Sequence, residues 1–394
     1  MIIKRFTEDI FISPFILLGR IIAALKPLKK EYRIFYFFPF YHTGGAEKIH
    51  AQVAKATGGS DSIIFFTKKS VDERFLQEFK ESGCEIRDIS KFTDNKWLYF
   101  LNLIYRGIIS GYINRQQQTI VFNGQCNFGY KISPWIKRTV PRLELLHSLN
   151  TFSYIRIPFL PFISKTVMIS KKRIEDHKEL YKKYNIPVSF IDRINFIPNA
   201  ISLPAVGPGK NKNRFTVLYT GRGTAEKRVG LIIKIAEAVR KENKEIQFEI
   251  AGDVSSAATI SDHPYIKFYG ALSDEQQLNS IYSTAHIFLL TSSAEGFPLA
   301  LMEAMANGCA ILTTPVGDIP YHVRNEENGF LFSSVEDEAA IINEALKKIL
   351  WLHDNYESFL KISANNISYA SHNFGIDRFN NDYRQLIKAV NPKN

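Results

Sequence analysis

Two glutamates separated by seven residues mark the densest group of side chains that could do chemistry. Glu295 and Glu303 both lie in the segment SSAEGFPLALMEAMA, which directly follows the apolar run Ile287–Leu290. A carboxylate can accept several hydrogen bonds, so Glu303 on a helix could hold a vicinal diol such as that of a ribose. Glu295, in the loop before the helix, could hold the hydroxyls of a sugar ring.

The turn between the two glutamates favours an anion or sugar site. Pro298 suits the first position of a helix, where its missing N–H costs nothing. The amides near Gly296, Phe297 and Leu299 would then lack intrahelical partners and could bind a ligand. A pair of glutamates at this spacing is more often a cap and a surface acid. Here the strand, the turn and the small-residue helix together favour a binding site.

A second group of candidates, Gly221–Lys227 (GRGTAEK), comes directly after the predicted strand Phe215–Thr220. Arg222 offers bidentate contact to a phosphate and Lys227 adds a point charge, a combination that suits a diphosphate. The alternative is that both are solvated surface charges. Glu226 occupies the third glycine position of G-x-G-x-x-G, so the segment is not a dinucleotide fingerprint.

Two further candidates lie in the first half of the chain. Thr43–Glu47 (TGGAE) puts Gly44 and Gly45 at a predicted helix start, where a glycine backbone can approach a phosphate closely. Such a pair often serves only the turn, and the segment lacks the Lys-Ser/Thr ending of a P-loop. His147 ends the segment Arg142–His147, where a ligand-binding edge would form, although a lone histidine is as often structural.

The sequence predicts neither a metal site nor a disulfide scaffold. The cysteines, Cys84, Cys126 and Cys309, lie far apart, and their odd, sparse count fits a reducing compartment. The histidines form no metal-spaced pairs and no Asp-x-Asp occurs. We therefore expect no dedicated Mg²⁺ or Mn²⁺ site.

Alternating strands and helices must position these residues. Short β-branched and aromatic runs predict strands at Tyr32–Phe38, Ser62–Phe66, Glu85–Ile89, Thr119–Phe122, Leu143–Leu146 and Thr166–Ile169, then at Phe215–Tyr219, Gln247–Ile250, Ile266–Tyr269, Ile287–Leu290 and Ala310–Leu312. Helices are predicted at Gly45–Thr57, Lys171–Tyr184, Lys227–Lys241, Asp274–Tyr282, Pro298–Ala306 and Phe379–Val390. Near-continuous apolar strands between helices are typical of parallel sheets covered on both faces.

A Pro- and Gly-rich linker at residues 202–214 divides the chain into two α/β domains of similar size. We expect an N-terminal domain at residues 1–201, a C-terminal domain at 215–370, and a last segment, 371–394, that could return to the first domain. Such domain pairs bind ligands at the carboxyl ends of their strands, in the cleft between them.

Charge is distributed unevenly along the 394 residues. The formal net charge is +11, yet residues 1–200 alone hold 31 basic and 17 acidic side chains. The excess is therefore confined to the first half, where it could attract an anionic membrane or an acidic acceptor. A composition of 45% hydrophobic and 23% charged residues excludes disordered, collagen-like and coiled-coil proteins.

A basic amphipathic segment is predicted at residues 10–30. Its apolar stretch, Ile10–Leu25, is interrupted and falls short of a bilayer span, and acidic residues precede it, unlike in a secretion signal. Lys26, Lys29 and Lys30 follow it. The helix could lie on an anionic membrane surface or simply pack on its own domain.

These motifs together resemble glycosyltransferase family 4, the retaining group 1 enzymes with the two-Rossmann-domain GT-B fold. The resemblance rests on TGGAE, LLHS at His147, FIPNAI before the linker, GRGTAEK, EGFPLALMEA, TTPVGDIP and NGF. It covers the chain from about Tyr32 onward. It implies a nucleotide-sugar donor in the C-terminal domain and an acceptor in the N-terminal domain.

The resemblance also implies a role for each matching residue. Arg222 and Lys227 would neutralise the diphosphate, Glu303 would hold the ribose, Glu295 and the amides near Phe297 would orient the donor sugar, Gly45 would approach the phosphates, and His147 would contact the transferred sugar. Two departures stand out. Arg228 follows Lys227 where the family often has glycine, and Tyr321 stands where it often has an acid.

The predicted function is a cytoplasmic, metal-independent retaining glycosyltransferase, peripheral on the inner face of the membrane in one version, which builds a surface polysaccharide such as lipopolysaccharide or capsule. Its partners would be a nucleotide-sugar donor and a glycan or lipid-linked glycan acceptor. Three alternatives remain: a glycoside hydrolase using Glu295 and Glu303, a non-catalytic nucleotide-sugar or carbohydrate-binding protein, and a nucleic-acid binder. The last lacks a recognition motif.

Overall fold

The computed structural model describes residues 2–42, 44–95, 97, 99–147, 149, 151–204, 209–242, 245–257, 263–272 and 274–391. The side chains of residues 2–4, 6, 151, 152 and 275 are not part of this description. Thr43 of the TGGAE motif, Ser148 of LLHS, residues 205–208 of the predicted linker and the last three residues of the C-terminal segment lie outside the described residues.

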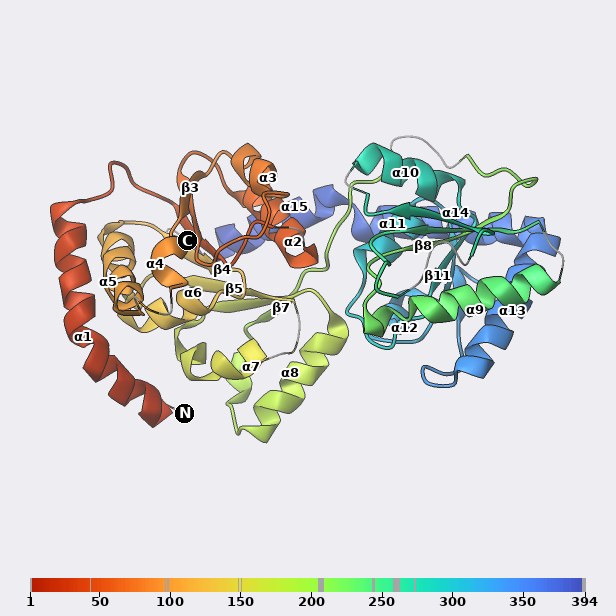
Figure 1. Cartoon of the computed structure of the whole chain (residues 1–394). Coiled ribbons are helices and arrows are strands. Elements are labelled where there is room, and N and C mark those ends of the chain that lie inside the picture. Colours follow the sequence, from red (N-terminus) through yellow and green to blue (C-terminus); the bar gives the residue numbers. More distant parts are fainter. Residues whose placement is uncertain are drawn as a thin grey trace. The chain divides into compact units, whose positions relative to one another are not determined.

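The chain divides into two compact units, drawn in Figure 1. Unit 1 comprises Met1–Pro198 and Asp377–Asn394, and unit 2 comprises Asn199–Ile376. The structural boundary precedes the predicted linker because Ile201 bridges to Gly375 and its N–H donates to Phe374 O at 2.9 Å. Residues 199–201, which were predicted to end the N-terminal domain, therefore belong to unit 2. Residues 371–376, which were predicted to begin the C-terminal segment, also belong to unit 2.

Unit 1 is built on a seven-stranded parallel sheet in the order β3-β2-β1-β4-β5-β6-β7. Its strands are β1 Ile34–Phe38, β2 Ser62–Phe66, β3 Glu85–Asp88, β4 Ile120–Asn123, β5 Arg142–Leu146, β6 Lys165–Met168 and β7 Ile194–Phe196. Every residue of β1, β2, β4 and β5 is buried. That is the expected state of apolar strands covered on both faces, and it confirms the predicted parallel α/β class.

The helices of unit 1 are α1 Ile2–Leu25, α2 Gly45–Thr57, α3 Leu76–Glu81, α4 Ser90–Thr93, α5 Tyr99–Arg115, α6 Asn127–Ile132, α7 Thr151–Ile155, α8 Lys171–Lys183 and α15 Ile376–Ala389. The C-terminal α15 packs on this unit through Tyr383, whose ring lies 6.2 Å from that of Phe122, and through Arg384, which donates to Ala56 O at 2.9 Å.

Unit 2 repeats the arrangement with six parallel strands in the order β10-β9-β8-β11-β12-β13. They are β8 Thr216–Thr220, β9 Gln247–Ala251, β10 Ile266–Gly270, β11 Ile287–Leu290, β12 Ala310–Thr313 and β13 Gly329–Leu331. The helices are α9 Val229–Lys241, α10 Glu275–Thr284, α11 Leu299–Ala306, α12 Ile319–His322, α13 Glu338–Asp354 and α14 Tyr356–Phe374.

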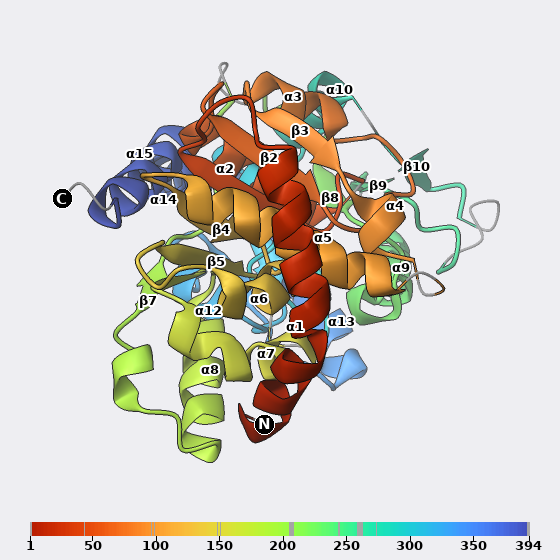
Figure 2. The same cartoon turned by 90° about the vertical axis from the view of Figure 1, so that its left-hand side faces the viewer.

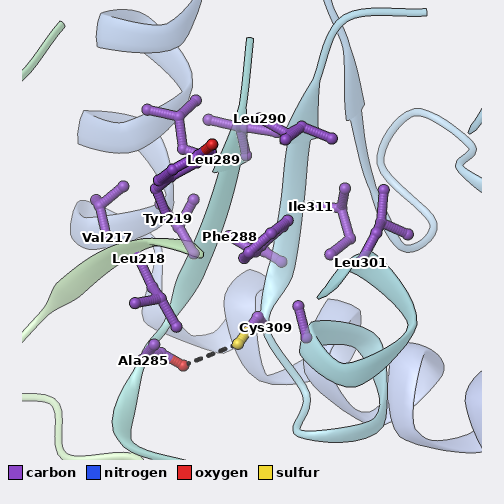
Figure 3. Close-up of a cluster of buried hydrophobic side chains, with 14 of the residues drawn as sticks. Val217, Leu218, Tyr219, Ala285, Phe288, Leu289, Leu290, Leu301, Cys309 and Ile311 are labelled. Carbon is purple, nitrogen blue, oxygen red and sulfur yellow. Dashed lines mark hydrogen bonds between the residues drawn. The ribbon is translucent and has the colours of Figure 1, made fainter. Parts of the chain in front are cut away.

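The core of unit 2 fills the space between its sheet and helices, as Figure 3 shows. Leu218 and Phe288 come from the adjacent central strands β8 and β11, and Leu301 comes from α11; each is fully buried. Cys309 is also buried, and its thiol donates to Ala285 O at 3.3 Å. These side chains pack the central strands, and the loops of the candidate site leave the carboxyl ends of those strands.

Helix α1 packs along α5 at close range (Figure 2). A Cβ added to Gly19 would lie 2.2 Å from Ile104 O, and one added to Gly107 would lie 2.3 Å from Ile16 O. Both glycines are therefore needed for the backbones to approach. The predicted amphipathic segment at residues 10–30 is helical only as far as Leu25, and the helix begins earlier, at Ile2. Among the described residues no helix is long and apolar enough to cross a bilayer.

A buried charge network ties β5 to its neighbours in unit 1. Glu144 and Arg156 form an ion pair at 3.2 Å, and both side chains are fully inaccessible. The carboxylate of Glu144 also accepts from Tyr130 OH at 2.8 Å and Thr166 Oγ1 at 2.6 Å, while Arg156 donates to Tyr181 OH at 2.6 Å. Each charge is thus compensated chiefly by the other.

Replacing Arg156 with Met should destabilise unit 1 by about 3–5 kcal/mol, because Glu144 would be left buried without its counter-charge. The double variant Arg156→Met/Glu144→Gln should recover a large part of that loss. Hydrogen exchange of β5 and β6 peptides in the full chain measures both. Equal protection in the single and double variants would contradict the proposed charge coupling.

Candidate functional site

The carboxyl ends of β8 and β11 bring the predicted donor-binding segments of unit 2 together. These strands are paired, with Val217 opposite Ile287 and Leu218 opposite Phe288. The loop after β8 carries Arg222 and Lys227, and the loop after β11 carries Glu295. Parallel strands end at one edge of a sheet, so cations and a carboxylate that are far apart in sequence become neighbours.

Lys227 and Glu295 are in direct contact. Lys227 Nζ lies 2.6 Å from Glu295 Oε1, and Ser292 Oγ donates to the same oxygen at 2.6 Å. The two charged side chains are only 18% and 8% exposed. Such a short, sheltered pair is strongly oriented, so the ammonium and the carboxylate occupy fixed positions at the sheet edge.

The two loops are also joined through their backbones. Ser293 N–H donates to Glu226 O at 2.8 Å, and Thr291 Oγ1 donates to Arg228 O at 3.1 Å. Glu226 is itself held by Thr224 Oγ1 at 2.7 Å. Lys227 belongs to the short 3-10 turn Ala225–Lys227, so its position depends on these cross-loop bonds.

Arg228 is a site residue that sequence reasoning noted only as a departure from the family pattern. Its backbone is left-handed, with φ of 49°. Its guanidinium donates to Thr291 O and to Val335 O, both at 2.6 Å, and more weakly to Ser292 O at 3.4 Å. A residue adjacent to Lys227 thus fastens the β8 loop to the β11 loop. The sequence signal that could have identified this role is the arginine at a position where the family often has glycine.

The predicted helix Lys227–Lys241 is correspondingly shorter than expected. Helix α9 begins at Val229, because the left-handed Arg228 cannot continue a right-handed helix. Lys227 therefore precedes the helix instead of starting it, and its side chain is free to reach across to Glu295.

Arg222 is exposed, next to a turn formed by close backbone packing. Tyr219 OH donates to Arg222 O at 2.8 Å. Gly252 of the neighbouring loop has φ of 130°, and a Cβ there would lie 1.8 Å from Gly221 O. Burial, with the nearby carboxylates of Glu295 and Glu226, raises the pKa of Tyr219 above its ordinary value. The hydroxyl therefore stays protonated and keeps donating.

Pro298 precedes helix α11 by one position, which corrects the prediction that it is the first helical residue. It has φ of −71° and ψ of 136°, so it is the extended N-cap, and α11 begins at Leu299. Leu301 and Met302 amides donate to Pro298 O at 3.1 and 3.3 Å. The first-turn amides, such as that of Leu299, have no intrahelical acceptor by geometry, so the predicted amide group survives the shift.

Phe297 turns its ring into the core. The ring stacks on His322 at 4.1 Å and approaches Phe374 at 5.3 Å. Gly296 contributes a carbonyl that accepts from Asp318 N–H at 2.8 Å, and a Cβ added to Gly296 would meet nothing within 4 Å. The Phe297 ring is therefore engaged in the core, so the predicted ligand contact of this residue falls to its backbone.

Glu303 lies one turn into α11, beside the end of β8. Burial and the Glu303 carboxylate raise the pKa of Tyr282 well above its usual value. Tyr282 OH shares a 2.5 Å hydrogen bond with Thr220 Oγ1 at the last residue of β8. Glu303 is only partly buried, so the carboxylate borders the same edge as the β8 loop.

In unit 1, His147 directly follows β5 and meets His50 of α2. Their Nε2 atoms lie 3.0 Å apart, so one ring donates to the other. Burial lowers the pKa of His147 to about 4, and burial together with His147 lowers that of His50 well below its usual value. Both rings are neutral at pH 7. His147 N–H donates to Gln125 Oε1 at 3.2 Å.

Gly44 and Gly45 stand at the start of α2, as predicted. Gly44 is the N-cap with φ of −179°, an extended conformation open to any residue. A Cβ added to Gly45 would meet nothing within 4 Å. The space beside Gly45 is therefore open to the close approach of a ligand, whereas a Cβ added to Gly44 would lie 2.1 Å from Glu47 Oε2. Within the described part of the chain, no three His, Cys, Asp or Glu side chains are grouped as metal ligands would be.

Comparison with known proteins finds a family match within the second half of the chain. Residues 206–366 match the family described as Glycosyl transferases group 1. A 163-residue stretch, 40% of this chain, is 27% identical to the GtfA subunit of the UDP-N-acetylglucosamine–peptide N-acetylglucosaminyltransferase of Streptococcus pneumoniae. The matched stretch is 30% of that relative's length, so the chain spans about a third of this curated protein.

Solved structures show the fold. The chain is similar to HepE of Anabaena in complex with UDP and glucose, with a TM-score of 0.70, 16% identity, and coverage of 91% of this chain and all of that one. It is also similar to a glycosyltransferase from Rickettsia africae, with a TM-score of 0.69, 16% identity, and coverage of 92% and 99%. The predicted GT-B fold, with two Rossmann-like units, is confirmed.

Replacing Arg228 tests the fastening of the two loops in unit 2. Arg228→Ala should destabilise the chain by about 2–3 kcal/mol, because buried carbonyl acceptors lose charged donors. Arg228→Gly should be about 1 kcal/mol more stable than Arg228→Ala, because glycine adopts φ of 49° without the steric cost. Thermal unfolding of both variants measures the difference, and equal stabilities would contradict the backbone account.

Proposed function

Since residues 206–366 belong to the group 1 glycosyltransferases, we propose that the protein moves a sugar from a nucleotide-diphosphate sugar to a glycan or lipid-linked glycan acceptor, with retention of configuration. One observation carries the proposal: at the carboxyl edge of the unit 2 sheet, adjoining loops carry Arg222, Lys227 and Glu295, and helix α11 carries Glu303. A diphosphate, a sugar ring and a ribose need this set of groups in this order.

The cations serve the diphosphate. An ammonium has three N–H donors, and the bond from Lys227 to Glu295 uses one of them. The others can reach phosphate oxygens without breaking the ion pair. Arg222, exposed at the turn after β8, can add the bidentate contact that suits phosphate.

Charge development explains how these groups would accelerate transfer. Breaking the sugar–phosphate bond builds positive charge on the sugar and negative charge on the departing diphosphate. Fixed cations and helix-start amides stabilise that leaving group, which is usually the largest catalytic effect. The Lys227–Glu295 pair is held before the substrate arrives, so little reorganisation is needed when the bond breaks.

Retention of the sugar's configuration would follow if the acceptor hydroxyl attacks from the face that the leaving group vacates. The acceptor hydroxyl then passes its proton to the departing phosphate, so no nucleophile from the protein is required. Glu295 would orient the sugar and Glu303 would hold the ribose. We propose that Arg222 and Lys227 supply the positive charge that metal ions provide elsewhere, so that transfer proceeds without an added divalent cation.

A uridine nucleotide is the first donor to examine. HepE of Anabaena was solved with UDP and glucose, and the streptococcal relative is named for UDP-N-acetylglucosamine. Both support a UDP-sugar for this chain. By resemblance to the family, the acceptor would belong to a cell-surface polysaccharide pathway such as lipopolysaccharide or capsule synthesis.

The surface of helix α1 supports peripheral attachment of the protein to the cytoplasmic face of an anionic membrane. Its outward face exposes large apolar side chains, from 37% to 80% of their surface: Ile10, Phe11, Phe15, Leu17, Leu18, Ile21 and Leu25. Lys26, Lys29 and Lys30 follow the helix and are exposed. An apolar face with a neighbouring basic cluster is the composition of helices that lie in the headgroup region of a membrane.

Donor binding and turnover test the proposed function together. UDP-sugars should raise the melting temperature of the native protein, and Arg222→Ala or Lys227→Ala should lower kcat by about 10²–10³-fold. Arg240→Ala, at an exposed position in α9, is the matched control and should be neutral. Full activity after treatment with a metal chelator is also expected.

Three outcomes would contradict this proposal. Near-native rates in both Arg222→Ala and Lys227→Ala would remove the diphosphate assignment. Donor binding without any transfer to glycan acceptors would favour the non-catalytic alternative. Release of sugar from a glycoside without a nucleotide would favour a hydrolase.

Membrane attachment is tested by sedimentation with vesicles at low salt. The protein should bind vesicles rich in phosphatidylglycerol and bind neutral phosphatidylcholine vesicles at least about tenfold more weakly. The double variant Phe11→Ser/Leu17→Ser should lose most of the binding, whereas Leu360→Ser, at a 40% exposed position of α14, should not. Equal binding by the native protein and the α1 variant would remove α1 as the attachment site.

A further inference from the structure

A cavity of about 160 Å³ lies at the carboxyl edge of the unit 1 sheet. Its walls come from the residues that follow β1, β2 and β4, including Pro39, Lys68 and Gln125, and from helices α5 and α6. A single water needs about 10–15 Å³ by this kind of measure. The cavity therefore has room for a ligand group much larger than water.

Two cations converge on one neutral oxygen in this cavity. Arg106 of α5 donates to Tyr99 OH at 3.1 Å, and Lys131 of α6 donates to the same oxygen at 3.5 Å. Lys68, after β2, lines the same space. Three positive side chains from three separate segments thus border one small volume.

The charges of Arg106 and Lys131 are not neutralised by a contacting acid. Among the described residues, no carboxylate lies within ion-pair distance of either one. Arg106 is only 5% exposed and its remaining partner is the amide of Asn102, at 2.9 Å. Asp94, which also lines the cavity, accepts from Lys69 N–H at 3.2 Å. The residues that line the cavity therefore carry three positive charges and one negative charge, while Asp9 and Glu8 of α1 also act on Arg106 from outside the lining.

The pKa of the Tyr99 hydroxyl reflects the two neighbouring cations. Burial would raise the pKa of the Tyr99 hydroxyl, but the charges of Arg106 and Lys131 outweigh burial and hold it below its usual value. Burial also lowers the pKa of Arg106, while Tyr99, Asp9 and Glu8 oppose that shift. The shift of Tyr99 means that negative charge is favoured beside Arg106 and Lys131, as an anionic ligand requires.

A second cavity of about 410 Å³ shares Asn127 and Lys131 with the first. Its other walls are mainly apolar and aromatic, with Tyr154, Ile155 and Phe159 among them. Arg5 and Glu8 of α1 complete it. A ligand whose anionic group fills the first cavity could extend its less polar part into the second.

We propose that the cavity bordered by Lys68, Arg106 and Lys131 binds a phosphate group of the acceptor. The identification of the ligand as the acceptor rests on the proposed function; the phosphate site itself rests on the cations and the cavity. The guanidinium of Arg106 and the ammonium of Lys131 meet at one phenol hydroxyl, and Lys68 lines the same cavity. Donors therefore come from several directions, as a tetrahedral anion requires.

The cavity is connected to the predicted sugar-contacting histidine. Gln125 lines the cavity, and its Oε1 accepts from His147 N–H at 3.2 Å. A phosphate held there would lie on the same sheet edge as His147, within unit 1. The phosphate would thus fix the acceptor close to the residue that the family pattern assigns to the transferred sugar.

The site is tested with inorganic phosphate and the full-length protein, without donor. Phosphate should raise the melting temperature relative to chloride at the same ionic strength. Lys68→Gln and Lys131→Gln, at partly exposed positions, should each weaken phosphate binding at least about fivefold. Lys178→Gln, an exposed lysine of α8, is the matched control and should bind as the native protein does.

Two phosphate esters distinguish the source of the ligand. Stronger binding of glycerol phosphate than of dimethyl phosphate supports a monoester, as in a sugar phosphate. The reverse preference supports a diester, as in a lipid-linked acceptor. Unchanged phosphate binding in both Lys68→Gln and Lys131→Gln would overturn the site.

The same variants separate this inference from the proposed function. Lys131→Gln should keep its melting-temperature response to UDP-sugars, raise the KM for a phosphorylated acceptor and leave that for the donor unchanged. If the native protein binds phosphate and the lysine variants do not, yet no acceptor receives a sugar, the phosphate site is retained and the proposed function is refuted. Unchanged KM for a phosphorylated acceptor would refute its use by the acceptor.

Discussion

The bonds from Arg228 to the backbone of the β11 loop are the interaction on which the candidate donor site depends. The β8 and β11 strands fix only the starting points of their loops; the guanidinium bonds to Thr291 O and Val335 O fix where those loops go. Lys227 precedes this anchor by one residue and therefore meets Glu295 at 2.6 Å. A strained backbone at φ of 49° is the cost of this arrangement. A structural arginine thus organises residues that would act on the substrate.

The fold was largely predictable because its signals are local. Strands β2 and β11 match their predicted ranges, since each is a short apolar run between polar turns. The strands β7 and β13 were missed because Ile194–Phe196 and Gly329–Leu331 are three residues long, and the first is not buried. Such edge segments are strands only because a neighbouring strand offers hydrogen bonds, a condition that no local pattern contains.

The candidate site was predictable in its members but not in its contacts. The motifs identified Lys227 and Glu295 separately, whereas their ion pair arises from the pairing of β8 with β11 and from Arg228. Pro298 was predicted to be the first helical residue but is the N-cap, one position earlier, because proline is tolerated at both positions. The cationic cavity of unit 1 escaped prediction altogether, since Lys68, Arg106 and Lys131 are spread over more than sixty residues without a motif.

The glycine contacts between α1 and α5 determine what kind of attachment α1 can provide. With Gly19 against Ile104 and Gly107 against Ile16, the two backbones approach closely and leave no room for a larger side chain at either glycine. Helix α1 is therefore packed directly on unit 1 instead of extending from it as a separate tether. If its apolar face enters a lipid headgroup layer, unit 1 acquires a fixed tilt and height above the lipid, and the cavity that Arg5 and Glu8 help to line acquires them too.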